Sequence, residues 1–140
     1  MAERHYTLEQ ANAALDWVRE RIDRLRTARE GLNDEEAREA LHEAGPTNGG
    51  GQPGRVVSDA FLEMRNALTE LQAMEVVLRD LDRGLVDFPS MRDGREVFLC
   101  WEEGEEEIGF WHDLDSGYGG RNPLRKRQAT APGAREAEPG

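Results

Sequence analysis

Hydrophobic residues recur at helical spacing early in the chain. They follow one another at intervals of 3, 4, 3 and 7 residues, at Leu15, Val18, Ile22, Leu25 and Leu32. These intervals place apolar side chains on one face of a helix. Thr7 and Gln10 have the spacing of a capping box, in which each side chain bonds the backbone of the other residue. The pattern predicts a helix over about residues 8 to 31, with a weaker acidic extension to residue 43.

A connector rich in glycine and proline separates this helix from a second one. It covers residues 44 to 57, and its first eleven positions hold five glycines and two prolines, which oppose regular structure. A second helix is expected over about residues 58 to 83. The same intervals return there, at Phe61, Met64, Leu68, Leu71, either Val77 or Leu78, and Leu81. Matching stripes predict an antiparallel pair with the crossing angle of coiled coils, and Gly84 is placed to end the second helix.

The hydrophobic period changes after Gly84. Three short runs rich in β-branched and aromatic residues follow, at residues 85–89, 96–101 and 108–112. Pro89 is expected to end the first run, and Asp93-Gly94 is a strong tight-turn pair. The predicted fold class is therefore α+β: a long antiparallel helical hairpin followed by a three-stranded antiparallel β-meander over residues 85–112.

The remaining sequence completes one predicted domain. Residues 113–124 form a glycine-rich polar loop, and we expect residues 1–124 to be a single domain. Residues 125–140 have no apolar anchor and are expected to be a disordered tail.

Charge and composition restrict the partners. Acidic residues outnumber basic ones by 29 to 18, which gives a formal net charge of −11. Such a chain repels phosphate backbones and anionic lipids, so we expect neither nucleic-acid nor membrane binding. Cys100 is the single cysteine, which fits a reducing compartment. The polar N-terminus lacks a signal-peptide pattern, and no apolar run is long enough for a membrane span, so the expected location is cytoplasmic.

Both faces of the predicted sheet are apolar. Along strand 96–101, Val97, Leu99 and Trp101 point to one side, and Phe98 and Cys100 to the other. A sheet of this kind needs two covers, and the helical hairpin supplies one. The second is the C-terminal loop, another subunit or a partner protein. We therefore expect a homo-oligomer, with a dimer favoured, or a complex with another protein.

His112 is the first residue with candidate chemistry. It precedes Asp113 and Asp115, so it is either a metal ligand or general base beside a carboxylate, or a strand-end histidine bonded to backbone. Cys100 and His112 are the candidate metal ligands. Their spacing matches no paired-ligand pattern, so no cofactor is predicted.

Asp87 and Arg121 are the other candidates. Asp87 is an acid in an apolar strand, and Arg95 or Arg121 would neutralise it if it is buried. Arg121 follows a glycine-rich stretch containing Tyr118, where a backbone can approach a ligand and arginine can grip a carboxylate or phosphate. The alternative is that Arg121 pairs with an internal acid.

Three blocks of the sequence resemble one family. They are His5-Tyr6-Thr7-Leu8-Glu9-Gln10-Ala11-Asn12, the run from Gly84 to Trp101, and Phe110-Trp111-His112 with residues 117–124. Over residues 5–124 the chain resembles the bacterial and archaeal family called domain of unknown function 2203. The resemblance implies a fold and a soluble prokaryotic protein, but no activity. Its blocks hold the candidate ligand-binding residues, which we expect to converge at one end of the meander: Asp87, Arg95, His112, Asp115, Tyr118 and Arg121, with Cys100 nearby.

Two functions remain open from the sequence. The first is a noncatalytic interaction or assembly module that oligomerises. The alternative is a small-ligand or metal-binding protein, or an enzyme, whose site is built from Asp87, His112 and Arg121. The chain has no serine-nucleophile elbow, Walker motif, His-Glu-x-x-His or paired-cysteine motif, which favours the noncatalytic function.

Overall fold

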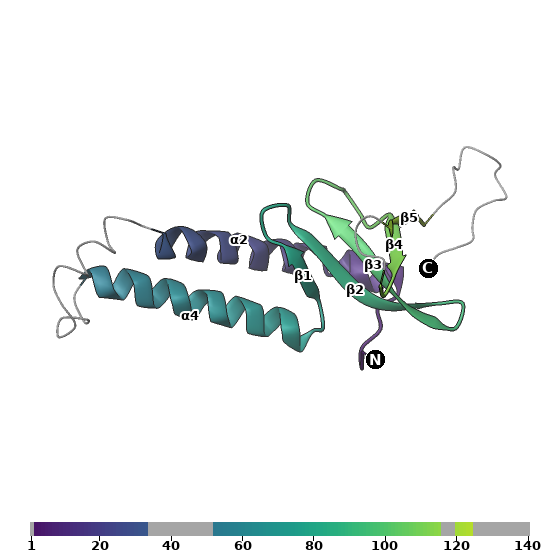
Figure 1. Ribbon diagram of the computed structural model, residues 1–140, viewed down its shortest axis with the longest axis horizontal. Helices are drawn as coiled ribbons and strands as arrows, with labels where there is room; N and C mark the ends of the chain where they lie inside the picture. The colour runs from purple at the N-terminus through teal and green to yellow at the C-terminus, as the bar shows by residue number, and fades with distance from the viewer. Residues whose placement is uncertain (1, 34–51, 116–119, 125–140) are drawn as a thin grey trace. The chain divides into compact units, whose positions relative to one another are not determined.

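The protein is an α+β molecule with a five-stranded antiparallel sheet (Figure 1). The computed structural model describes residues 2–33, 52–115 and 120–124. The elements are α1 (Leu8–Ala13), α2 (Leu15–Leu32), α4 (Gln52–Ala73), β1 (Val77–Asp80), β2 (Leu85–Arg92), β3 (Arg95–Glu102), β4 (Phe110–Asp113) and β5 (Asn122–Pro123). The α+β class is confirmed. None of the described helices is both long and apolar enough to cross a membrane.

The chain divides into two compact units. One holds Met1–Arg19 and Leu71–Gly140 and contains the sheet, and we call it the sheet unit. The other is Glu20–Glu70, which we call the hairpin unit. The predicted extension to residue 43 and most of the connector over 44–57 lie outside the described residues, as does the tail over 125–140.

The first helix begins as its capping box predicts. The Thr7 hydroxyl accepts from the backbone N–H of Gln10, and the Gln10 side chain accepts from the backbone N–H of Thr7, each at 3.0 Å. One continuous helix was predicted over residues 8 to 31, but α1 ends at Ala13 and α2 begins at Leu15. Ala14 between them still bonds the carbonyls of the preceding turn, so the interruption is local.

Within the hairpin unit, α2 and α4 run antiparallel. Arg21 lies 3.0 Å from Glu70, while Gly31, ten residues later in α2, faces Ala60, ten residues earlier in α4. A Cβ atom on Gly31 would stand 3.0 Å from the Cβ of Ala60. The two backbones therefore approach closely where both residues are small.

The bounds of the second helix differ from the prediction at both ends. It begins at Gln52, inside the predicted connector, because the first turn of a helix tolerates a proline such as Pro53. It ends at Ala73 instead of residue 83. Two residues after Ala73, Glu75 adopts a left-handed φ of 61°. Val77 and Leu78 lie in strand β1, and Leu81 lies in the turn after it, so extending the helical stripe to these residues was wrong.

The sheet is a meander with two more strands than predicted. Its order is β1-β2-β3-β4-β5, and each strand pairs with its neighbour in sequence. The Asp93-Gly94 turn is confirmed, with φ of 52° and 80°. Gly84 has the expected left-handed φ of 65°, but it lies in the turn between β1 and β2 instead of ending a helix. The predicted loop over 113–124 contributes β5.

Pro89 does not end its strand, because β2 continues to Arg92. The pairing of β1 with β2 stops at Asp87, so β2 is an edge at Pro89 on that side. There the Pro89 carbonyl accepts a 2.7 Å hydrogen bond from the backbone N–H of Tyr6. The ring nitrogen points to the same edge, and no hydrogen bond to β3 is lost.

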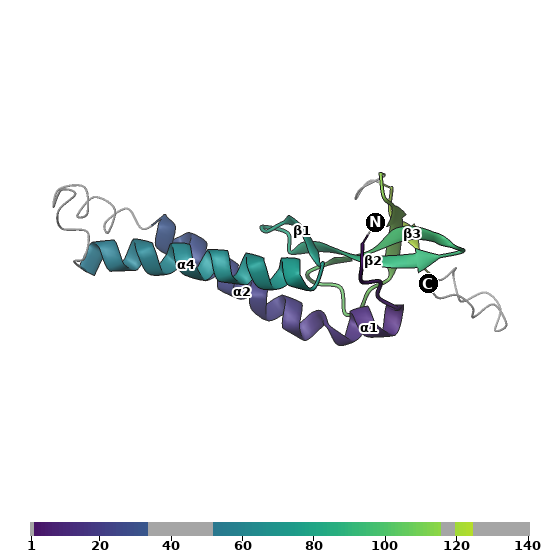
Figure 2. The same ribbon diagram turned by 90° about the horizontal axis from the view of Figure 1, so that it is seen from below.

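One face of the sheet forms the core of its unit, and we call it the helix face. It consists of the buried side chains Val86, Phe88, Val97, Leu99 and Trp101. Tyr6 packs edge-on against Phe88 with ring centroids 5.1 Å apart, and Arg19 lies over Trp101. Figure 2 shows α1 on this side of β2 and β3.

Arginine side chains lie across the opposite face, which we call the arginine face. It consists of Asp87, Phe98, Cys100, Phe110 and His112, from strands β2, β3 and β4. The guanidinium of Arg79 stands 5.0 Å from the centre of the Phe98 ring, and that of Arg121 stands 3.9 Å from the Phe110 ring. The two half-buried rings are thus covered in part from within the chain, one of them by the predicted C-terminal loop.

Candidate functional site

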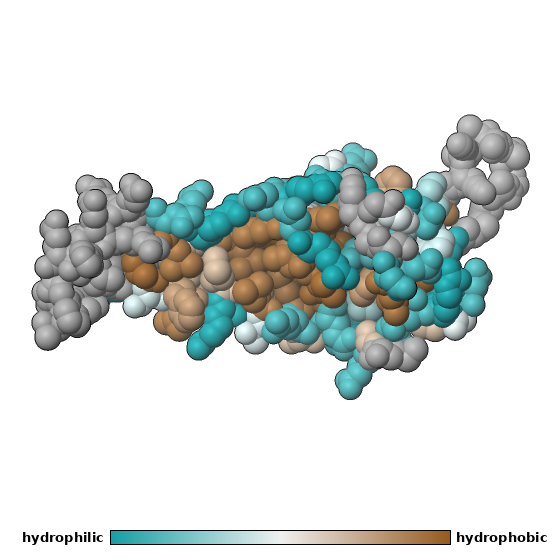
Figure 3. All heavy atoms as spheres, in the orientation of Figure 1, coloured by the Kyte–Doolittle hydropathy of each residue, from teal (hydrophilic) through white to brown (hydrophobic). Residues whose placement is uncertain are grey.

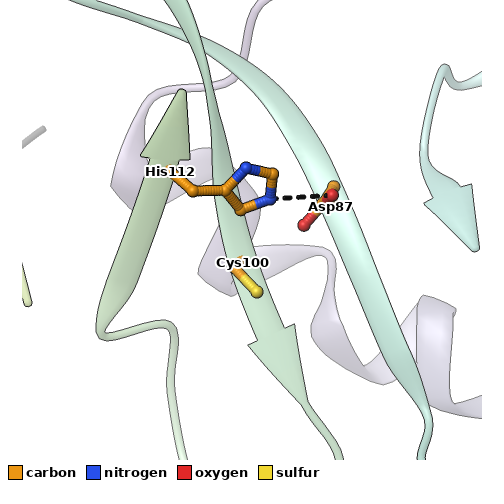
Figure 4. A group of neighbouring side chains, drawn as sticks. All are labelled: Asp87, Cys100 and His112. Atoms are coloured by element: carbon orange, nitrogen blue, oxygen red, sulfur yellow. Dashed lines mark hydrogen bonds and ion pairs between the residues drawn. The ribbon is translucent and has the colours of Figure 1, made fainter. Parts of the chain in front are cut away.

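Asp87, Cys100 and His112 meet on the arginine face. Asp87 and Cys100 are direct partners in the β2–β3 register, and His112 lies one step along on β4, opposite Phe98. Their potential ligand atoms all lie within 4.8 Å of one another. Figure 4 shows the three side chains turned toward one another from adjacent strands. All three are about 1% exposed, so the cluster is enclosed.

The hydrogen bonds of His112 define its tautomer. Nδ1 lies 2.7 Å from the backbone carbonyl of Asp113, and Nε2 lies 3.0 Å from Oδ2 of Asp87. A carbonyl oxygen only accepts, so Nδ1 carries the hydrogen. Nε2 then faces a carboxylate oxygen, and two lone pairs at this distance require a proton or another cation between them. His112 thus makes both contacts that the sequence left as alternatives: it is bonded to backbone at a strand end, and it lies beside a carboxylate, that of Asp87.

Asp87 is paired with an arginine that the sequence analysis did not consider. Nε of Arg79 donates to Oδ2 of Asp87 at 2.7 Å, whereas Arg95 and Arg121 were the predicted partners. Arg79 occupies a register shift between Leu78 and Asp80 in β1, and such a bulge re-aims a side chain. The other carboxylate oxygen of Asp87, Oδ1, is buried without a hydrogen-bond partner among the described residues.

Cys100 is a buried thiol that favours its protonated form. Burial, followed by the nearby charge of Asp87, raises the pKa of Cys100 to about 12. A nucleophilic cysteine needs a histidine as its base: one ring nitrogen accepts the thiol proton, and the other nitrogen is held by an orienting group. Both ring nitrogens of His112 are already engaged, by Asp87 and by the carbonyl of Asp113. The three residues therefore do not form a catalytic triad.

Arg121 lies beside the cluster and is bound to an internal acid. Its Nη2 donates to both oxygens of Glu105, at 2.8 and 3.0 Å, and it interacts with Cys100. Glu105 lies in the segment between β3 and β4. The structure thus brings Asp87, Cys100, His112 and Arg121 together, and ligand binding by them stays a prediction.

The other predicted site residues lie elsewhere. Arg95 is on the side of the sheet facing away from the cluster, where it is exposed and pairs with the Asp113 carboxylate at 2.8 Å. Asp115 is exposed in the loop after β4. Tyr118 lies outside the described residues. Arg79 and Glu105 were missed, and assigning residues 77–80 to a strand would have brought Arg79 into consideration.

An exposed apolar stripe on α4 is the second notable feature. Phe61, Leu62 and Leu68 are 59%, 43% and 37% exposed, and we call them, with Arg65 between them, the α4 stripe. In the orientation of Figure 1, hydrophobic residues gather over the stretch where α2 and α4 run side by side (Figure 3). Phe61 and Leu68 were predicted to pack against the first helix. Leu71 is buried as predicted, but the other buried positions among the described side chains of α4 are Ala60 and Ala67.

Comparison with known proteins places the chain in a family. No curated protein and no solved structure matches it. The model of the family described as "Uncharacterized conserved protein (DUF2203)" matches residues 4–124, which include the clustered residues on β2, β3 and β4 and the α4 stripe. The chain therefore belongs to the DUF2203 family.

Proposed function

We propose that this protein is a noncatalytic assembly module that pairs with a second copy of itself through the α4 stripe. The observation that carries the proposal is the exposure of Phe61, Leu62 and Leu68 on a single helix. Burying one such side chain stabilises an association by about 1.5–3 kcal/mol. Three of them contributed by each copy form a sufficient core for a small interface.

The spacing of the stripe favours another helix as the occupant. Phe61, Arg65 and Leu68 recur at intervals of four and three residues, the period at which helices pair in coiled coils. A twofold dimer brings the same stripe of two copies together, and this is the commonest symmetry of homo-oligomers.

The stripe carries no acidic side chain. The whole chain carries a net charge of −11, yet the charged residue within the stripe is Arg65. The acids Glu63 and Glu70 are turned toward α2, where they pair with Arg24 and Arg21. A twofold dimer sets this stripe against itself, so burial of its apolar side chains, and not charge complementarity, would hold the two copies together.

The state of Cys100 and His112 supports a role without catalysis. The thiol is held protonated by burial, and neither nitrogen of His112 is available to accept its proton. The nucleophile and base of a covalent mechanism are therefore not paired.

The test is the mass of the untagged full-length protein by native mass spectrometry and sedimentation equilibrium. The variant Phe61→Gln/Leu68→Gln removes apolar area and keeps good helix formers. We expect a dimer for the wild-type chain and at least about 100-fold weaker association for this variant. Met91→Gln/Leu114→Gln is the matched control, because Met91 and Leu114 are exposed apolar residues outside α4.

Each outcome decides the proposal. A dimer that is lost in the α4 variant and kept in the control supports it. A wild-type monomer at all accessible concentrations overturns it, as does a dimer that survives the α4 substitutions. A wild-type mass above a multiple of the chain mass would reveal a retained metal or cofactor, and it would be read separately from the dimer.

A further inference from the structure

We infer that Asp87, Cys100 and His112 form a binding site for a divalent transition metal of the zinc class. The inference concerns the sheet unit and is independent of the α4 stripe, so either can fail without the other. The sequence analysis named Cys100 and His112 as candidate metal ligands and, for its alternative function, placed a small-ligand or metal site at Asp87, His112 and Arg121, but it predicted no cofactor.

The donor set selects the class of ion. A thiolate sulfur, an imidazole nitrogen and a carboxylate oxygen together suit Zn²⁺ and its neighbours Co²⁺ and Ni²⁺. Calcium and magnesium prefer sites made of oxygen alone. Three protein ligands leave one position of a tetrahedral ion for a water or a small ligand.

The separations among the ligand atoms are close to those that a tetrahedral ion requires. Bonds of about 2.0–2.3 Å to the ion place pairs of ligand atoms roughly 3.3–3.7 Å apart. One ligand atom from each of the three residues lies within 4.8 Å of the others, and Nε2 of His112 is 3.0 Å from Oδ2 of the Asp87 carboxylate, whose other oxygen, Oδ1, is the proposed ligand. Small side-chain rotations are enough to match the two sets of distances.

The tautomer of His112 prepares Nε2 for coordination. Metal-binding histidines usually donate their other ring N–H to a carbonyl or carboxylate, which fixes the ring. Nδ1 of His112 is held in this way by the carbonyl of Asp113 at 2.7 Å. The lone pair of Nε2 is therefore directed at the carboxylate of Asp87, and a cation between the two removes their repulsion.

Asp87 supplies a second, independent observation. Oδ1 is buried and has no hydrogen-bond partner among the described residues, which is costly for a carboxylate oxygen. Oδ2 accepts from Arg79, as ligating carboxylates usually accept from an outer group. Coordination through Oδ1 would satisfy the unpaired oxygen and leave the Arg79 bond in place.

Binding would balance both charge and protons. The ion displaces the thiol proton of Cys100 and lies between Nε2 of His112 and the carboxylate of Asp87. The thiol proton is then released, and the two negative ligands, the Cys100 thiolate and the Asp87 carboxylate, neutralise the charge of the ion. Arg79 and Arg121 keep their carboxylate partners, Asp87 and Glu105, throughout.

Cobalt(II) is the probe for the test, because its coordination can be seen by absorbance. Full-length protein freed of metal with a chelator is titrated with Co²⁺ near neutral pH. We expect one equivalent to produce a near-ultraviolet thiolate-to-cobalt band, with visible bands of tetrahedral intensity. Cys100→Ser should abolish the thiolate band, and His112→Gln and Asp87→Asn should weaken binding at least about 10-fold.

His5→Gln is the matched control, since His5 is a histidine of the same unit that pairs with Glu96 away from the cluster. It should bind Co²⁺ as the wild-type protein does. X-ray absorption of the zinc-loaded wild-type protein provides a measurement that needs no variant to fold, and one sulfur ligand per zinc is expected. A wild-type protein that shows no thiolate band with Co²⁺ overturns the inference. So does a sulfur-free zinc shell, or a thiolate band that persists in Cys100→Ser.

Discussion

Asp87 was recognisable in the sequence as an acid within an apolar strand that would need a partner if buried. It is buried, and it has two partners, Arg79 and His112. That Asp87 would need a partner was predictable, because burying an unpaired carboxylate costs free energy. The identity of Arg79 was not, since it depends on a register shift in a strand that the helical spacing concealed.

At the residue scale, the stability of the metal-free protein should depend on the ionisation of Cys100. Its pKa is raised from 9.0 to about 12 in the folded state. The unfolded chain therefore loses this proton first, and stability is full below pH 9 and falls as pH rises toward 12. The loss has an upper limit of about 1.4 kcal/mol per pH unit.

Urea unfolding of wild-type and Cys100→Ala proteins, at a series of alkaline pH values with a chelator present, measures this loss. The difference in unfolding free energy between the two proteins should shrink as the pH rises, because the variant lacks the thiol. Tyr6, whose pKa is also raised by burial, is present in both and cancels. A constant difference across the series would show that Cys100 titrates alike in both states.

At the scale of elements, signals from adjacent residues predicted the structure correctly, whereas the spacing of apolar residues did not predict where α4 ends. The capping box at Thr7 and the turn at Asp93-Gly94 both formed, because each depends on a few adjacent residues. The end of α4 and the existence of β1 were mispredicted. Leu71 and Leu78 are seven residues apart, which fits a helical stripe. That spacing in the sequence is the same whether the helix continues or the chain turns at Glu75.

The capping box yields a prediction for the first helix. Thr7→Ala removes the oxygen that accepts from the N–H of Gln10, and it should lower the free energy of unfolding by about 1 kcal/mol. Thr27→Ala serves as the control, because Thr27 is exposed within α2 and alanine favours a helix there. Denaturant unfolding of both variants gives the comparison. Equal stabilities for the two would mean that the cap contributes nothing.

At the scale of the whole molecule, the sequence argued for a second cover on a sheet that is apolar on both sides. The described residues supply part of that cover, with Arg79 over Phe98 and Arg121 over Phe110. The stronger reason to expect assembly is now the α4 stripe, which lies in the hairpin unit instead of on the sheet.

The net charge predicts how salt affects the proposed dimer. Two chains of charge −11 repel each other, while the stripe that joins them is mainly apolar. Salt screens the repulsion, so the dimer should tighten as ionic strength rises. Sedimentation equilibrium at low and high sodium chloride measures this directly, with Phe61→Gln/Leu68→Gln remaining monomeric in both. Weaker association at high salt would indicate an interface dominated by ion pairs.

The sequence by itself determined what nearby residues decide: the helix cap, the α+β class, the central strands and the Asp93-Gly94 turn. It also singled out Asp87, Cys100, His112 and Arg121 as polar groups in a largely apolar region. Only the tertiary structure decided which of them meet, since strand register and a one-residue bulge set those contacts. It also decided that alanines of α4 are buried while Phe61 and Leu68 stay exposed, because close packing of two helices selects small side chains over large ones.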